Sequence, residues 1–321
     1  MIPRIRFAHL PTQIEPLPRL EKALNGPHLL VKRDDQTGLA FGGNKTRKLE
    51  FLVAEAQAAG ADTIITAGAL QSNHCRQTAA AAARFGFGCI LVLVGEPPAQ
   101  VSGNLLLDDL LGARIIWTDK NRRDEILQAT LDSARKQGKK PYLVPYGGSN
   151  STGALGYTFA MEEFVDQGIH ADWVIFASSS GGTQAGLVLG ARLFHFSGKI
   201  LGISVDEPQR NLQIQVARLA SETSERLGPR IEFAADEVLV NADYAAPGYG
   251  VLTGAERDAI RLFAKNEGLL LDPVYTGRAA AGLLDLIRKG FFRNNETVLF
   301  WHTGGQPALF AEKYQNDLRR A

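Results

Sequence analysis

The sequence predicts an α/β fold class, in which mostly parallel sheets carry helices on both faces. Short apolar runs alternate along the chain with longer amphipathic ones, which is the pattern of strands joined by crossover helices. Some short runs, such as 90–94, are apolar almost throughout, as expected for strands that are covered on both sides. The 321 residues include 33 glycines, many of them clustered after the apolar runs. At roughly 150 residues per domain, the length suggests one large domain or two modest ones.

Eight apolar runs have the length and composition of strands, and helical stretches lie between most of them. We expect the strands at 29–32, 63–66, 90–94, 114–117, 142–144, 173–177, 200–205 and 298–301. The clearest helical stretches are 45–59, 77–84, 125–136, 154–166 and 183–194. No obvious linker separates two domains, which is compatible with a domain that the chain leaves and later re-enters.

Composition favours a protein that binds neither nucleic acid nor membranes. Lys and Arg number 35 against 34 Asp and Glu, so the charge gives no preference for polyanions. Cys75 and Cys89 are too few for a disulfide scaffold, and the six histidines are scattered, so we expect no metal site. The longest apolar run, 89–94, falls far short of the ~20 residues that cross a bilayer. Without a signal-peptide pattern, a cytoplasmic location is expected.

Four polar segments follow predicted strands, and they outline a ligand site. Open α/β sheets bind ligands beyond the carboxyl ends of their strands. The segments are 67–74, 145–150, 178–183 and 302–305. All four could face one crevice.

The segment from Ser180 to Thr183 could hold a phosphate group. It leaves a predicted strand and opens a helix, so its backbone amides would converge at a helix N-terminus, where anions are favoured. It matches neither the Walker A loop nor the dinucleotide glycine pattern. The alternative is an ordinary tight turn with a capping serine.

A second helix begins with an unusual concentration of positive charge. Lys45, Arg47 and Lys48 lie within one turn of its start, where the helix dipole is already positive. A lysine in such surroundings would have a lowered pKa, as a Schiff-base lysine requires. The alternative is a solvated basic face.

The stretch 71–74 and its neighbours allow more than one interpretation. Ser72 or Asn73 could cap a helix, or this loop could hold a substrate carboxylate. His74 could act as a base or be packed. Cys75, on an alanine-rich helix with no assigned base, is interpreted as a buried small residue. Tyr275 could be an ordinary half-buried aromatic residue.

Together these segments resemble one family of enzymes. The motifs that carry the resemblance are Gly-Gly-Asn-Lys45-Thr-Arg-Lys-Leu-Glu, Gln71-Ser-Asn-His74-x-Arg-Gln-Thr78, Gly181-Gly-Thr-Gln-Ala-Gly186, Asp272-Pro-Val-Tyr275 and His302-Thr-Gly-Gly305. They are similar to those of the pyridoxal-phosphate (PLP) enzymes grouped as 1-aminocyclopropane-1-carboxylate deaminase and D-cysteine desulfhydrase. The resemblance extends from about Pro11 to Gly305.

The resemblance implies the PLP fold-type II architecture, which is tryptophan-synthase β-like, usually in a homodimer. A larger domain would comprise 1–47 and 156–321, and a smaller domain 48–155 would be inserted in it. Pyridoxal 5'-phosphate would lie in the cleft between the two domains, and the substrate would be a small amino acid.

The resemblance also implies roles for individual residues. Lys45 would hold the cofactor as a Schiff base, with Lys48 adding positive charge near its phosphate. Asn73 would bind the phenolic oxygen, and Ser72 would bind the substrate carboxylate or help to move a proton. The phosphate would be bound by Ser180, Gly181, Gly182 and Thr183. The substrate side of the site would include His74, Tyr275 and, as a weaker candidate, Tyr249 in Gly248-Tyr-Gly250.

Two threonines indicate which activity of the family to expect. Deaminases typically have Glu after the motif tyrosine, beside the pyridine nitrogen, and Leu after the late histidine. Here the residues are Thr276 and Thr303, the pattern of the desulfhydrases. A threonine leaves the ring nitrogen more nearly neutral, so the cofactor is a weaker electron sink. Such a sink is sufficient for the expulsion of thiolate but less suited to the opening of a cyclopropane. Ser179 stands where related sequences often have glycine.

We therefore expect a D-cysteine desulfhydrase, which forms pyruvate, hydrogen sulfide and ammonia. Alternatives within the family are a lyase acting on L-cysteate or another β-substituted alanine, and a 1-aminocyclopropane-1-carboxylate deaminase. If the protein is not an enzyme, the alternative is a non-catalytic protein that binds PLP or a phosphorylated metabolite. A thiol enzyme that uses Cys75 ranks last.

Overall fold

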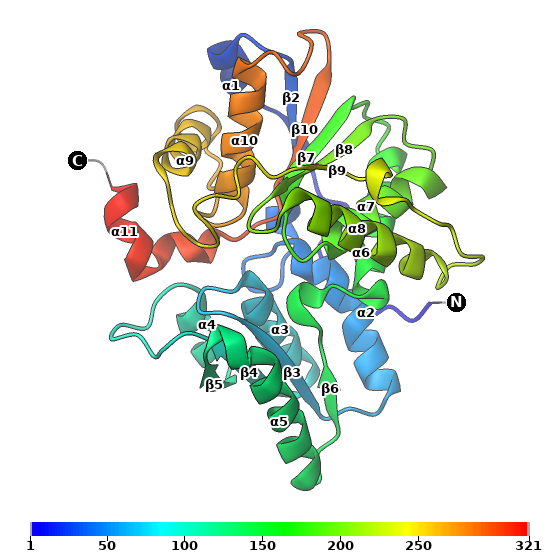
Figure 1. Cartoon of the computed structure of the whole chain (residues 1–321), viewed down its shortest axis with the longest axis vertical. Coiled ribbons are helices and arrows are strands. Elements are labelled where there is room, and N and C mark those ends of the chain that lie inside the picture. The colour runs from blue at the N-terminus through cyan, green and yellow to red at the C-terminus, as the bar shows by residue number, and fades with distance from the viewer. Residues whose placement is uncertain (1, 320–321) are drawn as a thin grey trace.

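The chain folds around two separate sheets, which a computed structural model describes over residues 2–319. Figure 1 shows the six-stranded sheet in one half of the molecule and the four-stranded sheet in the other. Met1, Arg320 and Ala321, which belong to the expected larger domain, lie outside the described residues.

The six-stranded sheet combines strands from both ends of the chain. Its order is β1-β2-β10-β7-β8-β9, and only β1 runs antiparallel to its neighbour among the described strands. The strands are β1 (Ile14–Pro16), β2 (His28–Lys32), β7 (Trp173–Ser178), β8 (Lys199–Ser204), β9 (Leu239–Asn241) and β10 (Thr297–Trp301). The first and last parts of the chain thus share one sheet.

The four-stranded sheet is parallel throughout and has the order β5-β4-β3-β6. Its strands are β3 (Thr63–Ala69), β4 (Gly88–Val94), β5 (Arg114–Thr118) and β6 (Pro141–Leu143). All eight expected strands are present, and the predicted fold class is confirmed. The sequence analysis did not identify β1 and β9, because three residues are too few to show an apolar pattern.

Helices cover both faces of both sheets. They are α1 (Pro18–Leu24), α2 (Asn44–Ala58), α3 (Asn73–Phe85), α4 (Asn104–Leu110), α5 (Arg123–Lys136), α6 (Ser151–Asp166), α7 (Gly182–Leu193), α8 (Gln209–Ser224), α9 (Gly254–Glu267), α10 (Thr276–Arg288) and α11 (Glu312–Leu318). The helix expected at 77–84 begins four residues earlier, at Asn73, because the Ser72 side chain caps it there. Among the helices of residues 2–319, none has the length and apolar character needed to cross a membrane.

Alternate residues of one strand enter different cores, which explains the continuously apolar runs. Ile175 of β7 packs in the core with α9 and α10, whereas Val174 and Phe176 pack in the core with α6 and α7. In the smaller sheet, Ile64 faces α2 and α3 and Ile65 faces α5. A strand that is buried on both faces cannot alternate apolar with polar residues.

The expected domain division stays a prediction. The strands of the smaller sheet all lie within 48–155, but the boundaries at 47–48 and 155–156 fall inside helices α2 and α6. These two helices meet closely, because a Cβ at Gly156 would lie 2.6 Å from the Arg47 carbonyl group. The two halves are therefore joined by packed helices.

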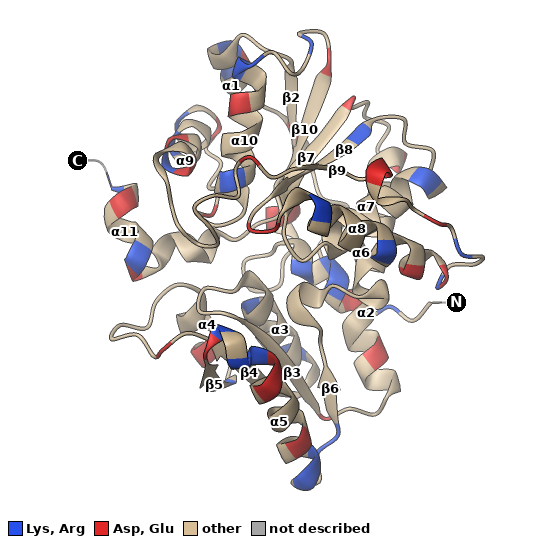
Figure 2. Ribbon diagram, in the orientation of Figure 1, with Lys and Arg blue, Asp and Glu red and all other residues tan. Residues whose placement is uncertain are grey.

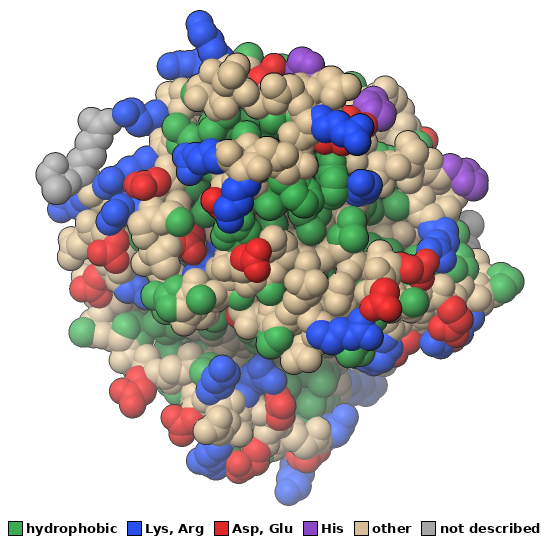
Figure 3. All heavy atoms as spheres, turned by 45° about the horizontal axis from the view of Figure 1, so that its top comes forward, with side chains coloured by type: hydrophobic (Ala, Val, Ile, Leu, Met, Phe, Trp, Pro, Cys, Tyr) green, Lys and Arg blue, Asp and Glu red, His purple; other side chains and the backbone are tan. Residues whose placement is uncertain are grey.

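Charges of both signs are mixed over the molecule. Figure 2 shows Lys and Arg interspersed with Asp and Glu on the helices and loops, and Figure 3 shows the same mixture over one face. The formal net charge is +1. The surface is therefore of mixed charge.

Candidate active site

A pocket of about 620 Å³ lies where carboxyl ends of strands from both sheets meet. Each of the four polar segments contributes to the wall, which confirms that they face one crevice. The lining residues are Asn44, Lys45, Ser72, Asn73, His74, Tyr146, Gly147, Ala177, Ser178, Ser179, Ser180, Gly181, Thr183, Tyr275, Thr303 and Gly304.

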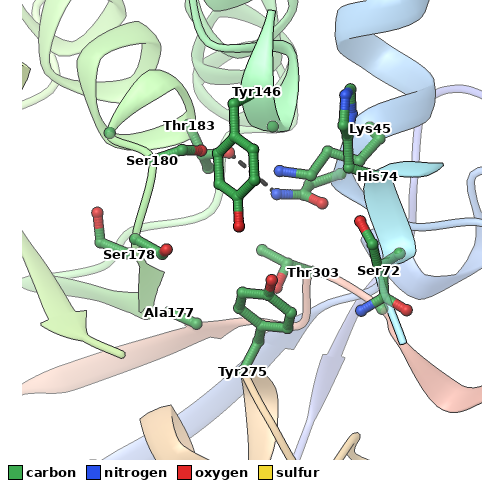
Figure 4. A pocket seen from close by; sticks show the side chains of 16 residues that line it. Lys45, Ser72, His74, Tyr146, Ala177, Ser178, Ser180, Thr183, Tyr275 and Thr303 are labelled. Carbon is green, nitrogen blue, oxygen red and sulfur yellow. Dashed lines mark hydrogen bonds between the residues drawn. The ribbon is translucent and has the colours of Figure 1, made fainter. Parts of the chain in front are cut away.

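Lys45 enters the pocket from the first turn of α2 (Figure 4). Burial of its amine lowers the pKa to about 8. Lys48, one turn further on, does not line the pocket; its Nζ donates to Gly147 O at 3.1 Å and to Ser149 Oγ at 3.2 Å. Burial and the charge of Lys45 hold the pKa of Lys48 well below its ordinary value. An amine with a lowered pKa is partly neutral near physiological pH and can act as a nucleophile or base.

The interpretation of this segment as a solvated basic face is wrong. Arg47 and Lys48 are each 1% exposed. Arg47 points away from the pocket and pairs with Asp34 at 2.8 Å and Glu163 at 2.9 Å. The three cationic side chains therefore lie in different surroundings. Lys45 alone among them lines the pocket.

The loop between β7 and α7 has the form of an anion cradle. Gly181, the N-cap of α7, has φ 74°, a value that favours glycine. Gly182 N donates to Ser149 Oγ at 3.2 Å, and that hydroxyl lies 2.8 Å from Ser180 Oγ. A Cβ at Gly182 would lie 2.5 Å from Ser149 Oγ and 2.9 Å from Lys48 Nζ. Backbone N–H groups of the helix start, hydroxyls and a nearby lysine could together bind a phosphate.

The start of α3 forms a second cradle on the other side of Lys45. Ser72 Oγ accepts from Cys75 N at 3.1 Å, so Ser72 is the N-cap and also lines the pocket. Asn73 Oδ1 accepts from Asn104 Nδ2 at 2.9 Å, which fixes the orientation of its amide. The first N–H groups of a helix have no intrahelical acceptor. They could therefore bind a carboxylate.

His74 is a neutral side chain in the pocket wall. Thr66 Oγ1 donates its single proton to Val144 O at 2.8 Å, so its 2.8 Å contact with His74 Nε2 must be donated by the histidine. Within the described residues His74 Nδ1 has no partner, which leaves it as an acceptor. Burial and the charges of Lys45 and Lys48 hold the pKa of His74 well below its usual value.

Tyr275 lines the pocket opposite these cradles, and Tyr249 packs behind it. The hydroxyls of Tyr249 and Tyr275 are 2.6 Å apart, and their rings meet edge to face with centroids 5.8 Å apart. Burial raises the pKa of both hydroxyls well above the usual value. Asp272 accepts from the N–H groups of Val274 and Tyr275, both at 3.0 Å, and so fixes the backbone that carries Tyr275.

The two threonines named from the sequence lie in different surroundings. Thr303 lines the pocket. Thr276 is fully buried beneath it, and its hydroxyl donates to Asp272 Oδ1 at 2.7 Å. The structure therefore brings Thr303, but not Thr276, to the pocket surface. Tyr249 and Gly182 also lie behind this surface rather than on it.

Sequence reasoning missed Asn44 and Tyr146. Asn44 N donates to Thr303 O at 3.0 Å, and Asn44 Nδ2 donates to Thr183 Oγ1 at 3.0 Å, so one residue links three walls of the pocket. Its position directly before Lys45 was the available signal. Tyr146 follows a strand within a predicted polar segment, but a single tyrosine in a turn has no characteristic pattern.

Cysteine and metal chemistry have no support in the described structure. Cys75 is fully buried, and burial raises the pKa of its thiol well above the ordinary value, so its interpretation as a buried small residue is confirmed. Within residues 2–319 no group of three His, Cys, Asp or Glu side chains could hold a metal ion.

Comparison with known proteins identifies the family. A family model described as pyridoxal-phosphate dependent enzyme matches residues 5–304. The chain belongs to this family. It is similar to the crystal structure of an ACC (1-aminocyclopropane-1-carboxylate) deaminase homologue, with 37% identity and a TM-score of 0.90 over 99% of this chain and 95% of that one.

More distantly similar structures share the fold. Threonine deaminase isoform 2 from Solanum lycopersicum has 17% identity and a TM-score of 0.69, covering 97% of this chain and 82% of that one. A hydrogen sulfide-producing enzyme from Fusobacterium nucleatum has 17% identity and a TM-score of 0.65, covering 92% of this chain and 96% of that one. At this identity the likeness concerns architecture.

Members of the family depend on pyridoxal phosphate, and the pocket fits this cofactor. It presents a lysine amine of lowered pKa, as attachment to an aldehyde requires. It also presents the cradle at the start of α7, where only glycine fits at 182. None of the sixteen lining residues is Asp or Glu, so no carboxylate in the wall repels a phosphate. Lys45, Ser180, Gly181 and Thr183 are the lining residues best placed to hold it.

Proposed function

We propose that the protein is a PLP-dependent lyase that catalyses α,β-elimination, and that its substrate is D-cysteine. The observation that supports this is the absence of Asp and Glu among the sixteen lining residues. Bound PLP supplies an electron sink for the carbanion at the substrate α-carbon. A pocket without a carboxylate beside the ring nitrogen provides a weaker sink, which suffices to expel thiolate but serves the opening of an unactivated cyclopropane poorly.

Lys45 is proposed to move the α-proton. With a pKa of about 8, roughly a tenth of its amine is neutral at pH 7 and can accept a proton. The same low pKa favours attachment of the cofactor when no substrate is bound. Lys48 is proposed to contribute charge from behind the phosphate cradle, where its Nζ lies close to Gly182.

The start of α3 is proposed to orient the substrate. Ser72 and the free N–H groups that follow it would bind the substrate carboxylate, and Asn73, held by Asn104, would bind the phenolic oxygen of the cofactor. His74 would accept a hydrogen bond at Nδ1 rather than pair as a cation, because its pKa is strongly lowered.

Tyr275 is proposed to orient the reacting groups rather than to act as a base. Its raised pKa keeps its proton in place, and the bond to Tyr249 fixes the ring. Thr303 would lie near the pyridine ring, while Thr276 would act indirectly by holding Asp272. A homodimer and a cytoplasmic location stay predictions.

The test is a substrate panel with the purified holo-protein. D-cysteine, L-cysteine, L-cysteate and 1-aminocyclopropane-1-carboxylate are supplied in turn, and sulfide, pyruvate and 2-oxobutyrate are measured. We expect sulfide and pyruvate in equal amounts from D-cysteine, and no turnover by the Lys45→Ala variant. Substantial elimination by that variant would refute the role of Lys45.

The other outcomes distinguish the alternatives. Pyruvate from L-cysteate alone would keep the chemistry and change the substrate. 2-Oxobutyrate from the cyclopropane would establish the deaminase, which the 37% identity to an ACC deaminase homologue makes the second candidate. Bound PLP with no turnover of any amino acid would indicate a non-catalytic binding protein.

A further inference from the structure

Tyr146 stands at the junction of two cavities. The active-site pocket opens beside an outer cleft of about 1640 Å³. The residues that line both are Tyr146, Ser179 and Ser180. Two of these are serines, so Tyr146 is the one large side chain at the junction among the residues that the structure describes.

The opposite side of the junction is formed by the tyrosine pair. Tyr275 lines the pocket and Tyr249 lines the outer cleft, and their hydroxyls are 2.6 Å apart. Figure 4 shows Tyr146 and Tyr275 entering from opposite sides with their hydroxyls directed toward each other. A molecule that extends from the pocket toward the cleft therefore passes between aromatic side chains, beside Ser179 and Ser180.

A contact with Arg123 and the position of its own turn place the Tyr146 ring at the junction. The Arg123 guanidinium lies 4.9 Å from the ring centroid, on the outer-cleft side. The following residue, Gly147, has φ 66°, and a Cβ there would collide with Ser180 Oγ, so the turn that carries the tyrosine lies directly against the phosphate loop. Tyr146 is 38% exposed, so the ring also borders solvent at the mouth of the pocket.

We propose that Tyr146 limits the size of the β-substituent that the substrate can carry. This inference rests on the proposed function only in naming the substrate class, which would be short β-substituted alanines of about the size of cysteine. A longer substituent has to displace a ring that Arg123 covers. Removing the Tyr146 ring would join the pocket to the outer cleft and so make room for a longer β-substituent.

The experiment measures equilibrium affinity for amino acids that carry no leaving group. Alanine, 2-aminobutyrate, norvaline and norleucine, in both enantiomers, are titrated into holo-protein while the cofactor absorbance is recorded. For wild type we expect affinity to fall by about tenfold or more along the series, the size of effect that one poorly fitting methylene can produce. Tyr146→Ala should abolish the fall, Tyr146→Leu should reduce it, and Tyr146→Phe should retain it.

Tyr142→Ala is the matched control. Tyr142 lies four residues earlier, donates to Glu55 and does not line either cavity. It should keep the wild-type length dependence. A Tyr146→Ala variant with the wild-type dependence would overturn the proposal, and so would a Tyr146→Phe variant that relaxes it as Ala does, because the limit would then depend on the hydroxyl. A size limit in a protein that releases no sulfide would support this inference and refute the proposed lyase activity.

Discussion

At the residue scale, the proposed chemistry depends on the protonation of Lys45. Its amine lies in the pocket wall with a pKa of about 8, lowered by burial, and only the neutral amine attacks an aldehyde. We expect the rate of PLP uptake by the apo-protein to rise about tenfold per pH unit below this pKa and to level off above it. The measurement is stopped-flow absorbance between mildly acidic and alkaline pH.

The control for this prediction is Lys45→Arg, which keeps a positive charge but has no neutral amine in this range. It should show no pH-dependent uptake phase. A wild-type profile that still rises steeply near the ordinary lysine pKa of about 10.4 would contradict the effect of burial.

The same residue shows what the sequence could predict. Three cations at a helix start indicated that one amine has a special role, and the family motif indicated Lys45. The sequence could not show that Arg47 turns away to Asp34 and Glu163, because those partners are distant in the chain. Nor could the sequence show that the Thr276 hydroxyl donates its hydrogen bond to Asp272. Such facts depend on side-chain directions that only the packed structure determines.

At the element scale, the start of α7 should tolerate no side chain at its first residue. A Cβ at Gly182 would lie 2.5 Å from Ser149 Oγ and 2.9 Å from Lys48 Nζ, so Gly182→Ala must displace the cradle. Overpacking of this kind costs about 1–3 kcal/mol. We therefore expect the Kd for PLP to rise by about tenfold. Equilibrium titration of apo-protein with PLP measures it.

Gly254→Ala is the matched control, because Gly254 is likewise the first residue of its helix, α9. The nearest atom to a Cβ there is Arg257 Nη2 at 3.5 Å, an ordinary contact. This variant should bind PLP as wild type does. Equal Kd values for the two variants and wild type would contradict the cradle at α7.

The helices and strands were largely predictable from the sequence. The elements that were missed or misplaced have physical causes. Strands buried on both faces produce continuous apolar runs, which the sequence displays at β4 and β7. The edge strands β1 and β9 were not predicted, because each has only three residues. The start of α3 was placed too late, because its first turn consists of polar residues that serve the pocket.

At the scale of the whole molecule, the pocket exists because two sheets present their carboxyl ends to each other. Segments from near residues 45, 72, 146, 180, 275 and 303 meet there, although they are spread along nearly the whole chain. Four of the walls were predictable, since ligand sites follow strands in open sheets. The contribution of Tyr146 was not, because it depends on how closely the turn after β6 approaches the loop after β7.

Reductive trapping of the cofactor tests directly whether Lys45 holds PLP. Holo-protein is treated with borohydride, digested and mapped by peptide mass spectrometry. We expect one pyridoxyl group, on Lys45, and no modification of Lys48, whose amine lies behind the pocket wall. A pyridoxyl group on Lys48 or another lysine, or a protein that cannot be reconstituted with PLP, would contradict the assignment of Lys45.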